Sequence, residues 1–159
     1  MTHETLARLR AMLRQHAERV ARLHPPEKPL SDETERRRRE CGERLQHIAL
    51  PVLQAVTAEL RSAGHEASVR DFSDTSDSYP SVALAFAPRV PGANPLASVL
   101  ILRCDPRRGV AVQRDIKPAK GRIVTGTHDR HGTMKVDALS VEWVESKTLS
   151  FVEAVLKAT

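Results

Sequence analysis

The residues best suited to chemistry lie close together near position 130. His128, Asp129 and His131 place two imidazoles and a carboxylate in one short loop. Such groups bind transition metals, but a structural zinc site uses four ligands, and Arg130 stands between these three. The sequence therefore favours a solvated turn, and we expect no cofactor. A metal-dependent enzyme built on this loop remains an alternative.

Other catalytic patterns are missing from the sequence. It contains no phosphate-binding loop, no G-x-S-x-G nucleophile elbow and no pair of carboxylates placed for acid–base work. Cys104 begins the segment CDPRRG, but a cysteine phosphatase loop needs an arginine six positions after the cysteine, where this chain has Val110. We interpret Cys104 as a small buried thiol at the end of a strand. The sequence therefore favours a protein that is not an enzyme.

Nucleic-acid binding is a second hypothesis, because positive charge is concentrated in two stretches. The formal net charge is +5, residues 103–135 carry nine Lys and Arg against three Asp and Glu, and one helical segment holds four consecutive arginines. Phosphate binding needs a contiguous surface, whereas hairpin turns alternate between the two ends of a sheet. The aromatic residues on which single strands stack lie outside the basic stretch. The residues of this alternative interface are Arg36, Arg37, Arg38, Arg39, Arg107, Arg108, Lys117, Lys120 and Arg122.

The cysteines and the hydropathy indicate a cellular compartment. Cys41 and Cys104 are far apart, and neither belongs to a C-x-x-C pair. We therefore expect unpaired thiols in a reducing compartment. No segment resembles a signal peptide, and no apolar run approaches the ~20 residues of a membrane span. The sequence predicts a soluble, cytoplasmic protein that does not bind membranes.

A heptad stripe marks the first helix, over residues 4–23. Its members recur at steps of three and four: Leu6, Leu9, Leu13, His16, Val20 and Leu23. A stripe shorter than three heptads needs partner helices, from the same chain or from a second chain. Three prolines then make a stiff connector, so residues 1–30 are predicted either to fold back along the next helix as a helical hairpin or to form an arm held away from it.

A long helix is predicted over residues 31–63, and the rest of the chain is organised around it. Ser31 can cap its start, and Gly64 follows its end. Its first half is charged and is predicted to project into solvent. Its second half carries an apolar face from Leu45 to Leu60. Pro51 predicts either a kink near Leu50 or a second helix that begins there.

After Gly64 the apolar period changes from helix to strand. Strands are predicted over 66–72, 82–87, 98–104, 110–116, 122–128 and 133–138, with short turns between them. The alanines that alternate with Val82, Leu84 and Phe86 predict a strand covered on both faces. Ser140 can cap a closing helical region over 140–158. We therefore predict an α+β domain over residues 31–159, with an antiparallel β-meander of five or six strands closed by a C-terminal helix.

The leading functional hypothesis follows from the heptad stripe and the missing catalytic set. We expect a non-enzymatic interaction or adaptor protein. It self-associates, or binds a protein partner, through Leu6, Leu9, Leu13, His16, Val20 and Leu23.

Overall fold

The computed structural model describes residues 2–23, 32–74, 79–118 and 130–159, and for residues 130 and 131 it describes the backbone alone. The chain forms two units, Met1–Ser31 and Asp32–Thr159. The first contains one helix, α1 (His3–Leu23), which buries none of its side chains.

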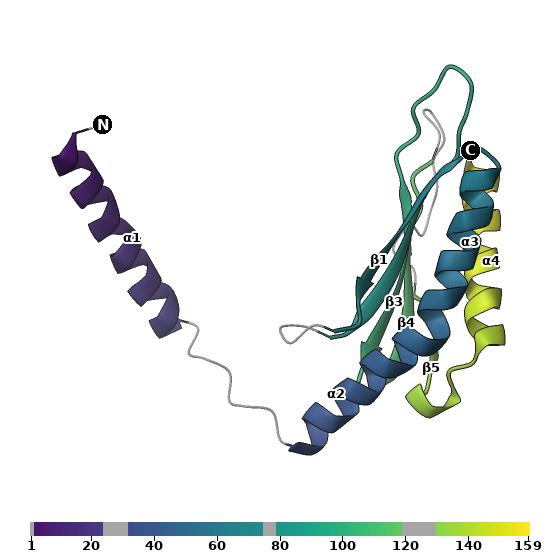
Figure 1. Cartoon of the computed structure of the whole chain (residues 1–159), viewed down its shortest axis with the longest axis horizontal. Helices are drawn as coiled ribbons and strands as arrows, with labels where there is room; N and C mark the ends of the chain where they lie inside the picture. The colour runs from purple at the N-terminus through teal and green to yellow at the C-terminus, as the bar shows by residue number, and fades with distance from the viewer. Residues whose placement is uncertain (1, 24–31, 75–78, 119–129) are drawn as a thin grey trace. The chain divides into compact units, whose positions relative to one another are not determined.

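The second unit is a layer of helices on an antiparallel sheet (Figure 1). Its strands lie in the sheet in chain order, β1-β2-β3-β4-β5, so the predicted α+β meander is confirmed. The elements are α2 (Asp32–Arg44), the π-helical turn η1 (Leu45–Ala49), α3 (Leu50–Ser62), β1 (Glu66–Phe72), β2 (Ser81–Ala87), β3 (Ser98–Asp105), β4 (Gly109–Asp115), β5 (Arg130–Met134), the 3-10 turn η2 (Val136–Ala138) and α4 (Val141–Ala158).

Pro51 changes the long helix without breaking it. Proline has no N–H to donate and crowds the carbonyl four residues back. The helix widens into η1 immediately before the proline, where the Leu50 N–H donates to the Leu45 carbonyl. Pro51 then stands in the first turn of α3. The structure is thus close to the predicted second helix, joined to the first by a π-helical turn.

The charged half of this helix is held against the sheet, so its prediction as a free projection was wrong. Cys41 and Gly42 are buried, and a Cβ on Gly42 would collide with the carbonyl oxygen of Ser73. Cys41 also forms a disulfide with Cys104 at the end of β3. The prediction of two unpaired thiols was therefore wrong as well. Docking of α2 on β3 brings together cysteines that are 63 residues apart.

The strand predictions are right for the first four strands and differ for the fifth. The predicted strand 122–128 lies outside the described residues. Only the start of the predicted strand 133–138 is extended, within β5, because Val136–Ala138 forms the turn η2. Ser140 does cap α4, since its Oγ accepts the Trp143 N–H at 3.2 Å.

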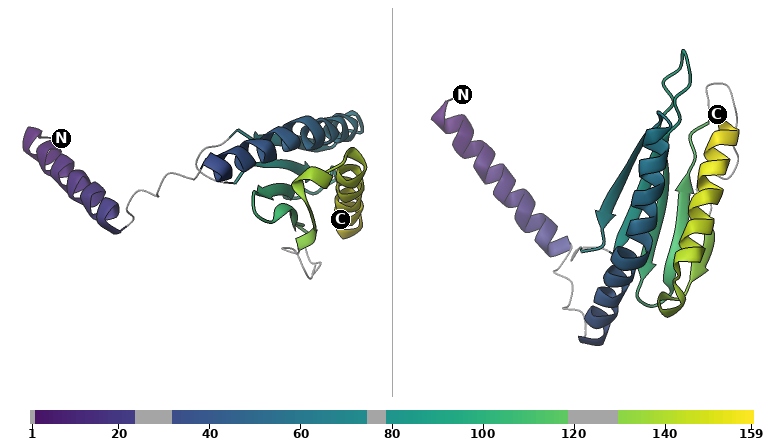
Figure 2. Two further views of the ribbon diagram at one scale, coloured as in Figure 1. Left: turned by 90° about the horizontal axis from the view of Figure 1, so that it is seen from below. Right: turned by 45° about the vertical axis from the view of Figure 1, so that its right-hand side comes forward.

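The core lies between the helices and one face of the sheet. The fully buried side chains of Leu84, Phe86 and Leu102 from the strands pack with Leu53 and Phe151 from the helices. The alternate residues of the same strands face away from this core. The two views in Figure 2 show α3 and α4 on the same side of the sheet. Among the described elements no helix covers the other face, although Ala83 and Ala87 of β2 are buried there, so the prediction that β2 is covered on both sides holds in part.

Arg44 fastens the end of α2 to the turn before α4. Its guanidinium donates to the carbonyl oxygens of Val136, Asp137 and Leu139, the last at 2.8 Å. Two of these carbonyls belong to the turn η2, where Val136 also accepts the Leu139 N–H, and the arginine adds side-chain donors to this turn. It thereby positions α2 beside the end of the sheet.

Replacing Arg44 with methionine, which keeps the apolar stem, should lower the free energy of unfolding by about 2 kcal/mol, because charge-assisted hydrogen bonds are lost. Urea denaturation measures the change. Arg36→Met, at an exposed position of the same helix, is the control and should change stability by less than ~0.5 kcal/mol. Equal effects of the two substitutions would contradict the role of Arg44.

Candidate functional site

The heptad stripe of α1 is exposed along its length. Leu13 is 59% exposed and Leu23 is 69% exposed, and Leu9 and Val20 are also exposed. Leu6 is half-buried and His16 is exposed on the same helix. Within residues 2–23, the described part of the first unit, nothing covers the stripe predicted from the sequence.

A second apolar surface lies between α3 and α4, which run side by side (Figure 2). The two helices border a groove of about 580 Å³. Leu149 projects at this surface with 62% of its area exposed, and Val141 is also exposed. Glu59 and Glu145 add acidic groups to a lining that is otherwise mostly aliphatic.

The four consecutive arginines of α2 are largely engaged with acids on the same helix. Arg37 contacts Glu33 at 2.7 Å, and Glu35 contacts Arg38 at 2.6 Å and Arg39 at 3.8 Å. The hydrogen bond from Arg38 lowers the pKa of Glu35 below its ordinary value. These pairs resemble the i,i+4 pairing expected of an exposed charged helix.

The structure nevertheless joins the two basic stretches of the sequence. A hollow of about 350 Å³ brings Arg37 of α2 together with Arg107 and Arg108 of the β3–β4 hairpin and with Lys135. Glu40 and Asp137 line the same hollow and offset part of its charge. The contiguity that the sequence could not establish therefore exists at this end of the sheet.

Arg108 also borders a second hollow, of about 280 Å³, on the uncovered face of the sheet. There the Arg103 guanidinium lies 5.1 Å from the centroid of the Tyr79 ring. Sequence reasoning counted Arg103 in the basic stretch 103–135 without naming it as an interface residue, and it missed Tyr79, because the two come close only through the pairing of β2 with β3. Only the alternation of Arg103 with buried neighbours along the strand indicated which face of the sheet Arg103 lies on.

Of the basic candidates that the structure describes, Lys117 does not join this surface. Lys117 follows β4 at the opposite end of that strand from the hairpin, and its ammonium contacts Asp115 at 3.0 Å. Lys120 and Arg122 lie outside the described residues. Within the described part of the chain, the structure thus brings together Arg37, Arg107 and Arg108 of the alternative interface and places Lys117 apart from them.

The metal candidates fall largely outside the described part of the chain. His128 and Asp129 are not described, and for His131 only the backbone is. Among the described side chains no group of three His, Cys, Asp or Glu could hold a metal ion. Within the same residues, no helix has the length and apolar character needed to cross a membrane.

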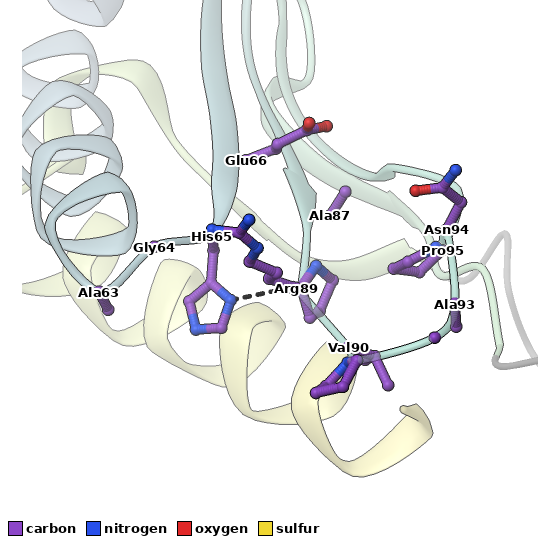
Figure 3. Close-up of a pocket in the computed structure, with 13 residues that line it drawn as sticks. Ala63, Gly64, His65, Glu66, Ala87, Arg89, Val90, Ala93, Asn94 and Pro95 are labelled. Atoms are coloured by element: carbon purple, nitrogen blue, oxygen red, sulfur yellow. Dashed lines mark hydrogen bonds between the residues drawn. The ribbon is translucent and has the colours of Figure 1, made fainter.

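A further hollow of about 770 Å³ lies where α3 meets β1, beneath the loop between β2 and β3. His65 borders it, and its Nδ1 accepts the Arg89 backbone N–H at 2.9 Å (Figure 3). The carboxylate of Glu66 points away from this imidazole in Figure 3. This hydrogen bond anchors the start of the loop, and the His65 ring packs edge-on against Phe86, with 5.7 Å between the ring centroids.

No family model, curated protein or solved structure matches this chain, so its function must be argued from the surfaces described above.

Proposed function

We propose that this protein is a self-associating interaction module whose α1 docks on a second copy. The observation that carries the proposal is the exposed apolar stripe on a 21-residue helix that buries no side chain. In proteins most of the stability of a helix comes from packing of its apolar face, which α1 lacks within its own unit among the described residues. Burial of each leucine against a partner would contribute roughly 1.5–3 kcal/mol.

The groove between α3 and α4 of the second copy suits this helix in length and character. At 1.5 Å per residue, the stripe from Leu6 to Leu23 extends roughly 26 Å. The groove follows the helical residues from His47 to Leu60, which is roughly 20 Å by the same rise. A helix lying in an apolar groove through residues three and four apart is a recurrent mode of recognition.

Charge favours this groove over pairing of two α1 helices. The positions beside the stripe include Arg10 and Arg19 and no acidic residue. Two α1 helices packed together would therefore form no ion pair across their seam. The groove offers Glu59 and Glu145 near its aliphatic lining, and opposite charges favour docking in register.

Leu13→Glu should weaken self-association by more than about tenfold, because it places a charge within the buried stripe. Light scattering with size-exclusion chromatography, over a range of protein concentration, measures the mass and the dissociation constant. Gln15→Glu adds the same charge on the opposite side of α1 and is the matched control. Leu149→Glu, in the groove, should give the same loss as Leu13→Glu.

Two results would contradict parts of this proposal. A monomer at every concentration, or an unchanged mass for Leu13→Glu, would overturn self-association through α1. A dimer that Leu13→Glu abolishes but Leu149→Glu leaves intact would keep self-association and reject the groove as the docking surface.

The cytoplasmic location expected from the sequence rested on unpaired thiols and on the lack of a segment that resembles a signal peptide. Disulfides form and persist mainly in oxidising compartments. The Cys41–Cys104 bond therefore argues against the cytoplasm, and we propose an oxidising compartment in its place. A thiol assay of the protein, isolated from its native cells under alkylating conditions, tests the proposed compartment. Two free thiols per chain would contradict an oxidising compartment and support the cytoplasm.

A further inference from the structure

We propose that the uncovered face of the sheet binds single-stranded nucleic acid. Strand pairing places the relevant residues in neighbouring rows. Phe72 is opposite Ser81, and Ser81 is opposite Arg103. Arg70 is opposite Ala83 in the next row. We call Arg70, Phe72, Tyr79, Arg103 and Arg108 the sheet-face patch.

Two aromatic rings at this face are available for stacking. Phe72 is 51% exposed and Tyr79 is 45% exposed, although aromatic residues make up only 3% of the chain. Tyr79 already stacks with a cation, since Arg103 lies over its ring. Unpaired bases stack on aromatic rings and on guanidinium planes in the same manner.

Small side chains separate these groups from one another. Ala83, Ala85 and Ala111 belong to the same face by strand alternation and register. A planar base can lie against a sheet, beside a ring or a guanidinium, only where the neighbouring side chains are small. The hollow bordered by Tyr79 and Arg103 has one of these small side chains, Ala111, in its lining.

The charge on this face suits a phosphate backbone. Three arginines of this face are exposed: Arg70, Arg103 and Arg108. Arg108 also borders the neighbouring hollow, which is lined by Arg37, Arg107 and Lys135. Acidic groups offset part of this charge: Asp105 lines the hollow on this face, and Glu40 and Asp137 line the adjoining one. The Asp105 carboxylate accepts the Arg107 backbone N–H at 2.9 Å, and Asp115 contacts Lys117.

This geometry favours a single strand over a duplex. Major-groove readers insert a helix or a two-stranded ribbon between the phosphate chains. The sheet-face patch is instead a surface with shallow relief, and its rings can stack only on bases that are not already stacked within a double helix. The site is independent of α1 and of the self-association proposed above.

Fluorescence anisotropy of a labelled 12-nucleotide single strand, as DNA and as RNA, tests the proposal on the full chain. We expect binding at low salt whose logarithm falls with log salt at a slope of about −2, from three phosphate contacts at −0.7 each. Tyr79→Ala should weaken binding about fivefold or more, through loss of stacking. Arg103→Glu should weaken it about tenfold or more, because it replaces attraction with repulsion. Lys157→Glu, at an exposed position of α4, makes the same charge change away from the patch and should leave affinity within about twofold.

Several outcomes would overturn the proposal. Undetectable binding at 50 mM salt is one of them. Another is equal affinity of the unmodified chain, Tyr79→Ala and Arg103→Glu. A duplex of the same sequence, or polyglutamate, that competes as well as the unlabelled single strand would show general attraction of polyanions and reject single-strand recognition. Circular dichroism confirms that each variant keeps its fold.

Discussion

Reduction of the Cys41–Cys104 disulfide should lower the free energy of unfolding by roughly 4 kcal/mol. The bond closes a loop of 63 residues, so it restricts the unfolded chain far more than the folded one. Both cysteines are fully buried, and the reduced thiols would remain acceptable as small apolar groups in the core. Urea denaturation of the oxidised chain, and of the same chain reduced before refolding, measures the difference.

The double variant Cys41→Ala/Cys104→Ala is the control for the reductant. It should unfold at one urea concentration with and without reducing agent, and that concentration should lie close to the midpoint of the reduced chain. Equal stability of oxidised and reduced protein would contradict the expected contribution. Two reactive thiols per chain, after denaturation without reductant, would show that the bond does not form.

The disulfide shows where prediction from this sequence stopped. Burial of Cys104 at the end of an apolar strand followed from the strand pattern and is confirmed. Its pairing did not follow, because Cys41 stands alone among charged residues and local pattern gave no reason to dock its helix. Gly42 and Ser73 make that docking close, and they are distant in sequence. A contact between segments that are distant in the chain leaves no periodic pattern in the sequence.

The helices and most strands could be predicted because their determinants are local. The sequence of the long helix offers a serine that can cap its start, an apolar face at helical spacing and a glycine beyond its end, and each of these signals is local. The π-helical turn before Pro51 was harder to predict, since proline permits a kink, a break or a bulge. In β5 the pattern was too short, and the turn at Val136–Ala138 ended the strand early.

The candidate surfaces also differ in whether their residues are close together in the sequence. The stripe on α1 could be predicted because one helix carries all of it. The sheet-face patch could not, because Tyr79 and Arg103 come from different strands and meet only through the register of β2 and β3. The approach of Arg37 to the β3–β4 hairpin likewise depends on how α2 lies at the end of the sheet. Local composition even argued against nucleic acid, since no aromatic residue falls within the basic stretch.

Gly109→Ala should lower the free energy of unfolding by about 3 kcal/mol, for two separate reasons. The first is conformational: Gly109 has φ +100°, which side chains with a Cβ rarely adopt. The second is steric: an added Cβ would collide with the carbonyl oxygen of Met134, and it would lie 3.2 Å from the Cα of Lys135. These are backbone atoms, so relief would require β5 and the turn after it to move away from β4.

Gly64→Ala separates the two causes, because Gly64 has a similar φ of +91° with nothing within 4 Å of an added Cβ. It should cost only about 1 kcal/mol, the conformational part alone. Thermal or urea denaturation of both variants beside the unmodified chain gives the difference that belongs to the collision. Equal losses of unfolding free energy for Gly64→Ala and Gly109→Ala would mean that β5 moves away from the added Cβ with no measurable loss of stability. The packing of β5 against the hairpin would then be looser than the structure shows. A larger loss for Gly109→Ala would establish that the hairpin bearing Arg107 and Arg108 is held rigidly against the chain before α4, as a preformed basic surface demands.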